Sequence, residues 1–518
     1  MQHFLQRFGS LVLGTLSGFD RLRFRGTFRL LANQPGMLRF LNSNHILLKE
    51  CSDYMEDISR QLRQRSEALA QSLGRPLVYL PSSGTCKEDV AREIAQRDGV
   101  SAGLIAVLSC VEPCRSYRVV GNRASHRLGL QSCYRKCLHY YHYFLHPTLG
   151  FLHARLQSWF PFNLHVNING REWLARQMDQ AGIAYVRSGN CFLGVDDFQR
   201  AQALLDEQLR ANWPGLLNPI AEQVNLVREL LQKRYPIPYY WSAEETEWAT
   251  DVLFRSAEEL ARWYPRLLRH GMEALSSLDV MRFLGHREGR HGLPPNFQGE
   301  VVSDVRARPE GVRIKHRVNG NSVKMYDKQG AILRVETTIN DPLGMKVYRT
   351  AEGDEQGERK WRRLRKGVAD LQRRAQLSQS ANERYLEAMA AVQEKQTLQE
   401  LLGSVCQAVQ WQQERVRALN PLGADAGLLR VVNRGEYVLL GFRNRDVWQQ
   451  LYGKAASPQQ RRQQAAAVTR QLRLLRGHGL IGRVPKTHRY QLTPRGRGVI
   501  AAVLSALQAD TSKLAQAA

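Results

Sequence analysis

The sequence lacks several features that would place the protein in a familiar class. It has no apolar run long enough for a membrane-spanning helix and no signal peptide, and residues 1–18 are too short and too weakly apolar to cross a membrane. It has no GKS or GKT loop of the Walker type, so an ATP-driven motor is not expected. Eight cysteines in 518 residues do not indicate a disulfide framework. These absences favour a cytoplasmic protein without a membrane partner.

Acidic residues are also scarce relative to basic ones. Asp and Glu number 48 against 74 Lys and Arg, which gives a formal net charge of +26 and a pI near 10.1. A field of this size attracts nucleic acid and makes its binding dependent on salt. The alternatives are a basic surface that only confers solubility, or one that meets a membrane surface. We expect a nucleic-acid partner, DNA in preference to RNA, because the charge gathers in recognisable segments.

The length and patterning predict an α+β, multidomain chain. At 518 residues it can bury about three hydrophobic cores. Residues 1–235 alternate strand and helix patterns and predict a mixed α/β domain. Residues 236–417 predict a central domain with helices from about Ala243 to Arg282 and an antiparallel β-meander, and residues 418–518 predict a third domain.

Local periodicity places the elements of the first domain. Leu22 and Phe24 alternate with Arg21, Arg23 and Arg25, which is typical of a strand with one basic face. Strands are predicted at residues 19–28, 103–109, 117–120 and 163–169, and helices at residues 87–96, 171–181 and 198–212.

The central meander is the most informative segment and runs from Gly311 to Asn340. Its apolar and basic residues alternate, and Asn319-Gly320 supplies a type I′ turn. That turn places Lys315 opposite Lys324, and a second reversal is predicted at residues 328–330. Because the second loop can have two or three residues, the sequence does not determine which face of the sheet carries Glu336. One face is predicted to carry Arg313, Lys315, Arg317, Lys324 and Tyr326. Like charges opposite each other destabilise a sheet, and a bound polyanion would offset that cost.

The meander also carries residue types suited to phosphodiester cleavage. Either a tyrosine hydroxyl or a metal-activated water held between carboxylates can attack phosphorus. The predicted catalytic residues are Tyr326, Asp327, Glu336, Lys324 and Arg334, with the two cations stabilising charge on the phosphoryl oxygens. The predicted ligands of Mg²⁺ or Mn²⁺ are Asp327, Glu336 and, from a distant strand, Asp20, with Asp304 and Glu300 as further candidates. The alternative is that Lys324 and Glu336 form only a diagonal pair between strands.

The pattern VKMYDKQGAILRVETT resembles the Y-D-K … R-x-E hairpin of plasmid and phage rolling-circle replication initiators, over about 15 residues. The His-hydrophobic-His triplet of such nucleases does not appear in the sequence. The whole chain resembles a widespread bacterial family of mobile-element character, which supplies no established activity. These resemblances imply a DNA strand-cleaving or strand-transferring nuclease. A non-enzymatic DNA- or RNA-binding regulator remains the alternative.

A second basic segment follows the meander, and helical spacing then runs from Val368 to Leu402. It alternates positive charge with Trp361, a combination suited to a nucleic-acid backbone and a stacking ring. The alternative is a solvated segment whose Trp361 packs against the meander. The predicted phosphate contacts are Arg362, Arg363, Arg365 and Lys366.

The last segment carries 15 Lys and Arg against 3 Asp and Glu between Val431 and Ala518, a net charge of +12. Helices are predicted at residues 444–452, 459–476 and after Pro494, and strands at residues 480–484 and 489–493. The phrase LRLLRGHGLIGRVPKTHRYQLTPRGR resembles a winged helix-turn-helix domain of MarR-like regulators. The resemblance implies groove contacts by Arg462, Arg470 and Arg473 and wing contacts by Lys486, His488 and Arg489. A winged helix that binds protein or RNA is the alternative.

A cysteine and histidine cluster raises the question of structural zinc. It comprises Cys110, Cys114, Cys133, Cys137, His139, His142 and His146. The spacings are wider than the two intervening residues that zinc ribbons and fingers favour. Buried thiols and stacked rings in a core are therefore preferred over zinc here.

Overall fold

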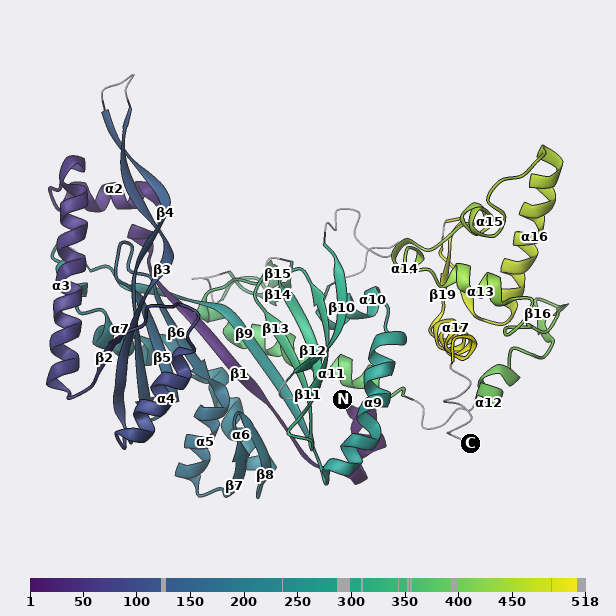
Figure 1. Cartoon of the computed structure of the whole chain (residues 1–518), viewed down its shortest axis with the longest axis horizontal. Helices are drawn as coiled ribbons and strands as arrows, with labels where there is room; N and C mark the ends of the chain where they lie inside the picture. Colours follow the sequence, from purple (N-terminus) through teal and green to yellow (C-terminus); the bar gives the residue numbers. More distant parts are fainter. Residues whose placement is uncertain are drawn as a thin grey trace. The chain divides into compact units, whose positions relative to one another are not determined.

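The computed structural model describes residues 1–122, 127–234, 236–286, 299–308, 311–342, 344–351, 354, 356–392, 398–485 and 487–509. The chain divides into two compact units, each drawn from separated stretches of sequence (Figure 1). One unit contains Met1–Val12, Phe254–Val335 and Ser380–Ala518, and the other contains Leu13–Leu253 and Glu336–Gln379. The division into domains at residues 235 and 417 stays a prediction, and residue 235 lies outside the described residues.

The unit that begins at Leu13 is built on a large mixed sheet, which confirms the α+β class. Its strand order is β13-β9-β1-β6-β5-β4-β3-β2. The strands are β1 (Val12–Phe28), β2 (Leu77–Tyr79), β3 (Gly103–Asn122), β4 (Arg127–His146), β5 (Gly150–Gln157), β6 (Leu164–Asn169), β9 (Tyr239–Phe254) and, through its second half, β13 (Ile332–Ile339). Strand β2 pairs parallel with β3, whereas β3, β4, β5, β6 and β1 pair antiparallel in succession.

Helices and two small hairpins complete this unit. The helices are α2 (Gln34–Ser43), α3 (Cys51–Ser72), α4 (Lys87–Arg97), α5 (Gly170–Ala181), α6 (Phe198–Glu207), α7 (Trp213–Val224) and α8 (Arg228–Leu231). The hairpins pair β7 (Tyr185–Ser188) with β8 (Cys191–Val195) and β14 (Lys346–Arg349) with β15 (Lys360–Arg363). The predicted helices at residues 87–96, 171–181 and 198–212 correspond to α4, α5 and α6, although α6 ends at Glu207.

Strand β1 shows why this sequence forms a sheet with one charged face. Leu22 and Phe24 are fully buried, and Arg21 and Arg25 on the opposite face pair with Glu247 and Glu244. Alternation of this kind buries one row of side chains and leaves the other at a polar surface. The predicted strand is confirmed and extends seven residues further toward the N-terminus.

Two sequence predictions in this unit were wrong. Residues 103–109 and 117–120 belong to one strand, β3, which continues through Pro113. A proline is tolerated there because β2 pairs only as far as Ser109 and leaves that edge of β3 open. The helical prediction from Ala243 also failed up to Phe254, because Tyr239, Trp241 and Ala243 are buried with the two-residue period of β9.

The other unit contains the meander, with helices α1 (Gln2–Phe8), α9 (Ala257–Glu273) and α10 (Ser277–Phe283). Strands β11 (Gly311–Val318), β12 (Asn321–Lys328) and β13 have the predicted boundaries, and Lys315 lies opposite Lys324 as predicted. Asn319 and Gln329 take positive φ at the two reversals. A further strand, β10 (Val301–Arg308), pairs with β11.

The C-terminal segment of this unit begins with α12 (Leu398–Gly403), β16 (Val409–Trp411), β17 (Glu414–Val416), α13 (Ala426–Val432) and α14 (Tyr437–Leu440). The two hairpin strands and the helices α13 and α14 were not predicted. The elements that follow have the predicted order: α15 (Asn444–Tyr452), α16 (Pro458–Gly477), β18 (Ile481–Arg483), β19 (Tyr490–Leu492) and α17 (Pro494–Leu507). The Ser457 hydroxyl accepts a hydrogen bond from the Gln460 amide and so caps α16. Ahead of this segment, α11 (Leu371–Met389) confirms the first part of the helical stretch predicted from Val368 to Leu402, but it ends at Met389, and residues 390–392 are not helical.

Among the described residues, none of the helices combines the length and the apolar composition needed to cross a bilayer.

One close approach positions the first turn of α5 against β1. A Cβ at Gly170 would lie 1.9 Å from the backbone oxygen of Phe19. We expect Gly170→Ala to cost about 3 kcal/mol of stability, because a backbone clash cannot be relieved by a side-chain rotation. Thermal unfolding measures the loss. The control is Gly121→Ala, where a Cβ meets nothing within 4 Å, and equal melting temperatures for the two variants would contradict the prediction.

Candidate metal centre

Three carboxylates from neighbouring strands converge in the unit that begins at Leu13. Asp20 lies on β1, Glu247 on β9 and Glu336 on β13, and β9 lies between the other two strands. Each offers an oxygen such that the three atoms lie within 4.8 Å of one another. All three are buried, with exposed fractions of 7%, 7% and 2%. Within the described part of the chain, this is the one group of three acidic, histidine or cysteine side chains that meets the geometry of a metal site.

The geometry and chemistry of this carboxylate cluster suit a hard divalent cation. Mg²⁺ binds oxygens at about 2.1 Å, so that its ligand oxygens lie roughly 3 to 4 Å apart. The separations in the cluster require only small side-chain movements to meet that requirement. Three buried negative charges at this distance repel one another, and a divalent cation would offset the repulsion. The residues present therefore fit Mg²⁺ or Mn²⁺.

Two neighbouring side chains, one a neutral amide and the other a cation, hold Asp20 in place. The Asn190 amide, at the turn between β7 and β8, donates to both Asp20 oxygens at 2.9 and 3.0 Å. Arg171, which is fully buried in the first turn of α5, lies 3.9 Å from Asp20 and 2.9 Å from Asp251. Partners that orient a ligand side chain commonly have large effects on metal affinity. We therefore regard Asn190 and Arg171 as positioning residues.

Glu247 is oriented by Arg21 and Thr338. The Arg21 guanidinium lies 2.8 Å from Glu247 and 2.9 Å from Glu245, and the Thr338 hydroxyl donates to Glu247 at 3.4 Å. Burial opposes the charge on Arg21, but attraction to Glu247, then to Glu245 and Glu336, raises its pKa above the ordinary value. Arg21 therefore stays charged beside the cluster.

Asp20 and Glu247 open onto a pocket of about 290 Å³. Its lining mixes acidic, basic, amide and apolar side chains: Asp20, Arg21, Glu88, Arg92, Phe151, Leu152, His153, Asn167, Ile168, Asn169, Asn190 and Glu247. The Asn167 amide lies 2.9 Å from Nε2 of His153. Burial, with the positive charges of Arg23 and Arg155, lowers the pKa of His153 to about 4, so that the ring is neutral at physiological pH. A pocket with cations beside carboxylates can hold a phosphate next to a metal ion.

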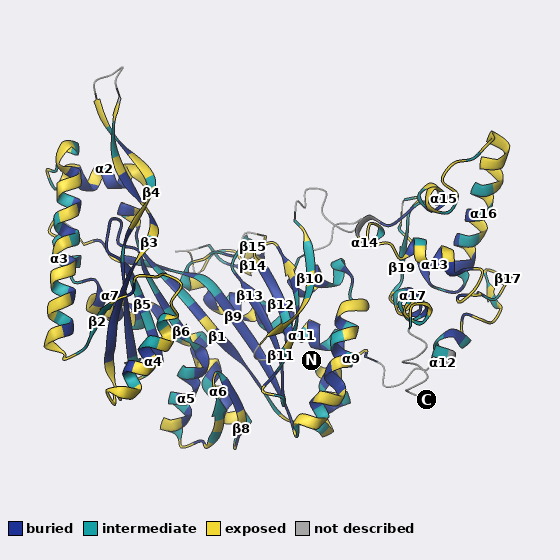
Figure 2. Cartoon of the chain, in the orientation of Figure 1, coloured by how far each residue is buried: buried dark blue, intermediate teal, exposed yellow. Residues whose placement is uncertain are grey.

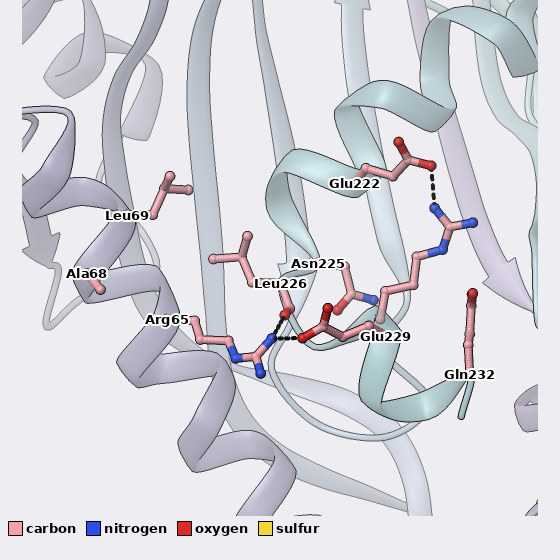
Figure 3. A pocket seen from close by; sticks show the side chains of 9 residues that line it. Arg65, Ala68, Leu69, Glu222, Asn225, Leu226, Glu229 and Gln232 are labelled. Carbon is pink, nitrogen blue, oxygen red and sulfur yellow. Dashed lines mark hydrogen bonds and ion pairs between the residues drawn. The ribbon is translucent and has the colours of Figure 1, made fainter. Parts of the chain in front are cut away.

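A larger pocket of about 660 Å³ lies between α3 and the α7–α8 region (Figure 3). Its charged side chains pair with each other: Arg65 with Glu229 and Arg228 with Glu222, both at 2.6 Å. Arg65 also donates to the backbone oxygen of Leu226. It contains none of the three clustered carboxylates, so its size does not make it the better candidate for chemistry.

Two of the three predicted metal ligands, Asp20 and Glu336, meet in the carboxylate cluster. The third, Asp327, is not part of it and lies on β12, where burial raises its pKa. Tyr326 and Lys324 lie half-buried on β12, and Arg334 is fully buried on β13. Asp304 on β10 lies opposite Lys315, and Glu300 comes just before β10. The predicted catalytic role of Tyr326, Asp327, Lys324, Arg334 and Glu336 stays a prediction.

The predicted basic face of the meander is present. Arg317 is exposed, and Arg313 and Lys315 are half-buried on β11. Burial, together with Lys324 and the neighbouring arginines, lowers the pKa of Lys315. The cost of this opposition to the stability of the sheet stays a prediction.

The second basic segment is a strand with an exposed aromatic pair. Residues Lys360–Arg363 form β15, and Trp361 lies opposite Tyr348 with ring centroids 5.7 Å apart. Arg363 and Lys366 are exposed. Arg362 donates to the Arg349 backbone, and Arg365 pairs with Asp370. Only part of this predicted set therefore presents charge to a ligand.

The predicted contacts of the C-terminal segment differ in their surroundings. Arg462 and Arg470 are exposed on α16, whereas Arg473 pairs with Glu414. His488 is exposed, and Arg489 donates to the backbone oxygen of Gly441 at 3.1 Å. Lys486 lies outside the described residues.

The cysteine and histidine cluster is spread along β3 and β4. Cys114 and Cys137 are both buried, with sulfurs 3.1 Å apart. His139 lies 3.9 Å from the Cys137 sulfur, and His142 stacks against Phe144. Within the described residues these side chains do not form a group of three with metal-ligand geometry.

Glu247 is the candidate ligand that sequence reasoning missed. It lies in the segment that was predicted to be helical, where a glutamate reads as part of a solvated face. The strand signal was present in YYWSAEETEWATDVLF, which is rich in aromatic and β-branched residues. A strand at this position would have drawn attention to Glu247 beside the basic face of β1.

The first prediction of this site concerns metal affinity. We expect the protein to bind Mn²⁺, and Glu247→Gln to weaken that binding at least about tenfold, because a ligand charge is lost. Isothermal titration calorimetry measures the dissociation constants. The matched control is Glu88→Gln, which removes the same charge from the same pocket outside the carboxylate cluster. Equal affinities for the two variants, or no saturable binding to the unaltered protein, would refute a metal centre here.

The second prediction concerns pH. Because the pKa of folded His153 lies near 4, below the ordinary value of 6.5, protonation favours the unfolded chain. The neutral His153 ring therefore costs the folded chain nothing above pH 6.5. As the pH falls from 6.5 toward 4, the free energy of unfolding decreases by about 3 kcal/mol at most. We expect His153→Gln to lessen the drop in melting temperature between pH 7.5 and 4.5. His488→Gln, at an exposed position, should leave the drop unchanged; an unchanged drop in both variants would contradict the prediction.

Comparison with known proteins adds no assignment to this centre. No protein-family model matches the chain, and no curated protein and no solved structure matches it. The chemistry of the carboxylate cluster is therefore inferred from its own residues and geometry.

Proposed function

We propose that the protein cleaves phosphodiester bonds in nucleic acid, using a divalent cation held by Asp20, Glu247 and Glu336. The observation that carries this proposal is the convergence of three buried carboxylates from neighbouring strands beside a pocket. Strands hold such side chains rigidly, which is a requirement for catalytic geometry. The net charge of +26 supports a polyanionic substrate.

The balanced reaction is hydrolysis. The oxygen of a water molecule adds to phosphorus, the bond from phosphorus to one ester oxygen breaks, and the proton lost by water neutralises the departing alkoxide. A bound Mg²⁺ or Mn²⁺ supplies Lewis-acid stabilisation of the phosphoryl oxygens and lowers the pKa of water. Asp20, Glu247 and Glu336 would hold the cation, and Asn190 orients Asp20. Arg92 lines the same pocket and is placed to contact a phosphate oxygen.

Other parts of the chain support a role for DNA in this proposal. The order of α15, α16, β18, β19 and α17 supports a winged helix in residues 418–518, which would bring the enzyme to duplex DNA. Arg462 and Arg470 are exposed on the helix that would enter the groove. Together with the resemblance to a mobile-element family, this targeting favours cutting or transfer of DNA strands.

A non-enzymatic binding protein is the second candidate. The opposed Lys315 and Lys324 on the meander favour it, because a bound phosphate backbone would relieve their repulsion without any chemistry. In that case the carboxylate cluster would have a structural role, and the protein would act as a regulator of DNA or RNA.

The cleavage assay separates these functions. We expect labelled single-stranded or duplex DNA to be cut with Mg²⁺ or Mn²⁺ and to remain intact with EDTA. Glu336→Gln should reduce cleavage by at least about a thousandfold while leaving DNA affinity equal or tighter, because a charge that repels phosphate is removed. Gel analysis of products and fluorescence anisotropy give the two measurements.

Two variants serve as controls for this assay. Glu93→Gln removes an exposed carboxylate of α4 outside the pocket and should cut normally. Tyr326→Phe should also cut, because water is the proposed nucleophile; loss of activity would instead indicate a covalent tyrosyl intermediate. If the unaltered protein cuts neither DNA nor RNA of any form with either metal, the binding function is the better account.

A further inference from the structure

The two longest strands of the sheet extend beyond their neighbours as a ribbon. Strands β3 and β4 each span 20 residues and pair from Gly103↔Leu145 to Asn122↔Arg127. Strand β2 accompanies β3 only to Ser109, and β5 accompanies β4 only from His139 onward. Residues 110–122 and 127–138 therefore form a two-stranded arm, which Figure 1 shows projecting beyond the other strands of its unit.

The arm is basic along its whole outer part. From Pro113 to Lys136 the sequence contains no Asp or Glu. Its described basic residues are all exposed: Arg115, Arg118, Arg127, Arg135 and Lys136. Figure 2 shows exposed stretches along this ribbon. The acidic residue at the base, Glu112, pairs with Arg155 at 2.6 Å and with Lys87 at 3.5 Å. No local carboxylate therefore neutralises the arm among these residues.

The basic side chains leave the ribbon on both of its faces. Lys136 lies opposite Pro113 and so shares a face with Arg115, while Arg118 and Arg127 lie on the other face. Solubility alone does not require that both faces of a ribbon lack acidic residues, because charges of either sign make a surface soluble. A ribbon inside a groove has a phosphate backbone on each side.

The width of the ribbon also matches a groove of duplex DNA. Its lower part packs against the rest of its unit, because Cys114, Ser116, Tyr117 and Leu130 are buried. The part beyond them runs from Val119 to Asn122 along β3, about 10 Å at the rise of an antiparallel strand. The major groove of B-DNA, about 12 Å wide, admits a two-stranded ribbon, whereas the major groove of A-form RNA is too narrow.

The base of the arm is fixed to the rest of its unit, so the arm can orient a ligand. The Tyr117 hydroxyl donates to the backbone oxygen of Leu31 at 2.7 Å. The Arg135 guanidinium lies 3.9 Å from the ring centroid of Trp159. Buried Cys114 and Leu130 anchor the ribbon in the hydrophobic core. Because these contacts restrict the arm, less entropy is lost when it binds.

We propose that the β3–β4 arm docks into the major groove of duplex DNA, with its basic side chains contacting the phosphate backbones on either side. This surface is separate in sequence from the C-terminal segment and from the meander. It rests on the proposed function only in sharing a nucleic-acid partner, since binding by the arm requires no cleavage.

The test uses the full chain and a 30-base-pair duplex, with EDTA present so that no cleavage occurs. The arm variant replaces Arg118, Arg127 and Lys136 with alanine. We expect its affinity for duplex DNA to fall about tenfold or more, and the salt dependence of log K to weaken by roughly 2 to 3, as for the loss of three phosphate contacts. Fluorescence anisotropy across a salt series measures both.

The matched control replaces Arg60, Arg63 and Arg97 with alanine. These arginines lie outside the arm in the same unit and are about two-thirds exposed, so the net charge changes equally. We expect its affinity to stay within about twofold of the unaltered protein. If the arm variant and this control bind duplex DNA equally well, the proposal is wrong.

Single-stranded DNA and duplex RNA provide the second comparison. The arm variant and the control should bind each of them equally, because neither offers a B-form major groove. An equal loss by the arm variant on all three ligands would overturn groove docking in favour of general attraction to polyanions. Failure of the cleavage assay would leave these binding measurements unaffected, and equal binding here would leave cleavage at the carboxylate cluster intact.

Discussion

The structure depends on holding negative charge inside a sheet. Asp20, Glu247 and Glu336 are buried on three neighbouring strands, and Asp251 lies four residues beyond Glu247 on β9. Burial of carboxylates in a low-dielectric interior is costly unless each gains a cation or hydrogen-bond donors. Arg171 and Arg21 provide part of that compensation. The closeness of the three carboxylate oxygens is what makes the carboxylate cluster suitable for a divalent cation.

The same requirement explains several features of the surrounding fold. Helix α5 approaches β1 so closely that only glycine fits at position 170, and this approach brings Arg171 between Asp20 and Asp251. The β7–β8 turn brings Asn190 to both oxygens of Asp20. These elements are separated by about 150 residues from β1 in the sequence, and each contributes one polar group. The three carboxylates and Arg171 are held rigidly because the strands β1, β9 and β13 and the helix α5 carry them.

Several segments of the chain carry basic surfaces, and these differ in how much of their positive charge can contact a ligand. Arg473 and Arg365 are paired with acidic side chains, and Arg489 is bound to backbone. Lys315 and Lys324 oppose each other across β11 and β12, and Asp304 lies opposite Lys315 on the other side. The outer arm of β3 and β4 has no acidic residues at all. A count of positive charge along the sequence therefore overstates some segments and overlooks others, because ion pairs form between residues that are distant in the sequence.

The sequence by itself determined the elements whose signals are local. Alternation and turn residues specified β11, β12 and β13, including the opposition of Lys315 and Lys324, because side-chain period and turn type set the register of a hairpin. Capping and helical spacing specified α15 and α16. The carboxylates Asp20 and Glu336 could be named as metal ligands, since their residue type and strand context were visible. Only the tertiary structure decided that Glu247, rather than Asp327, completes the cluster. The order of strands β13, β9 and β1 arises from long-range pairing, and the sequence near each strand carries little information about its neighbours.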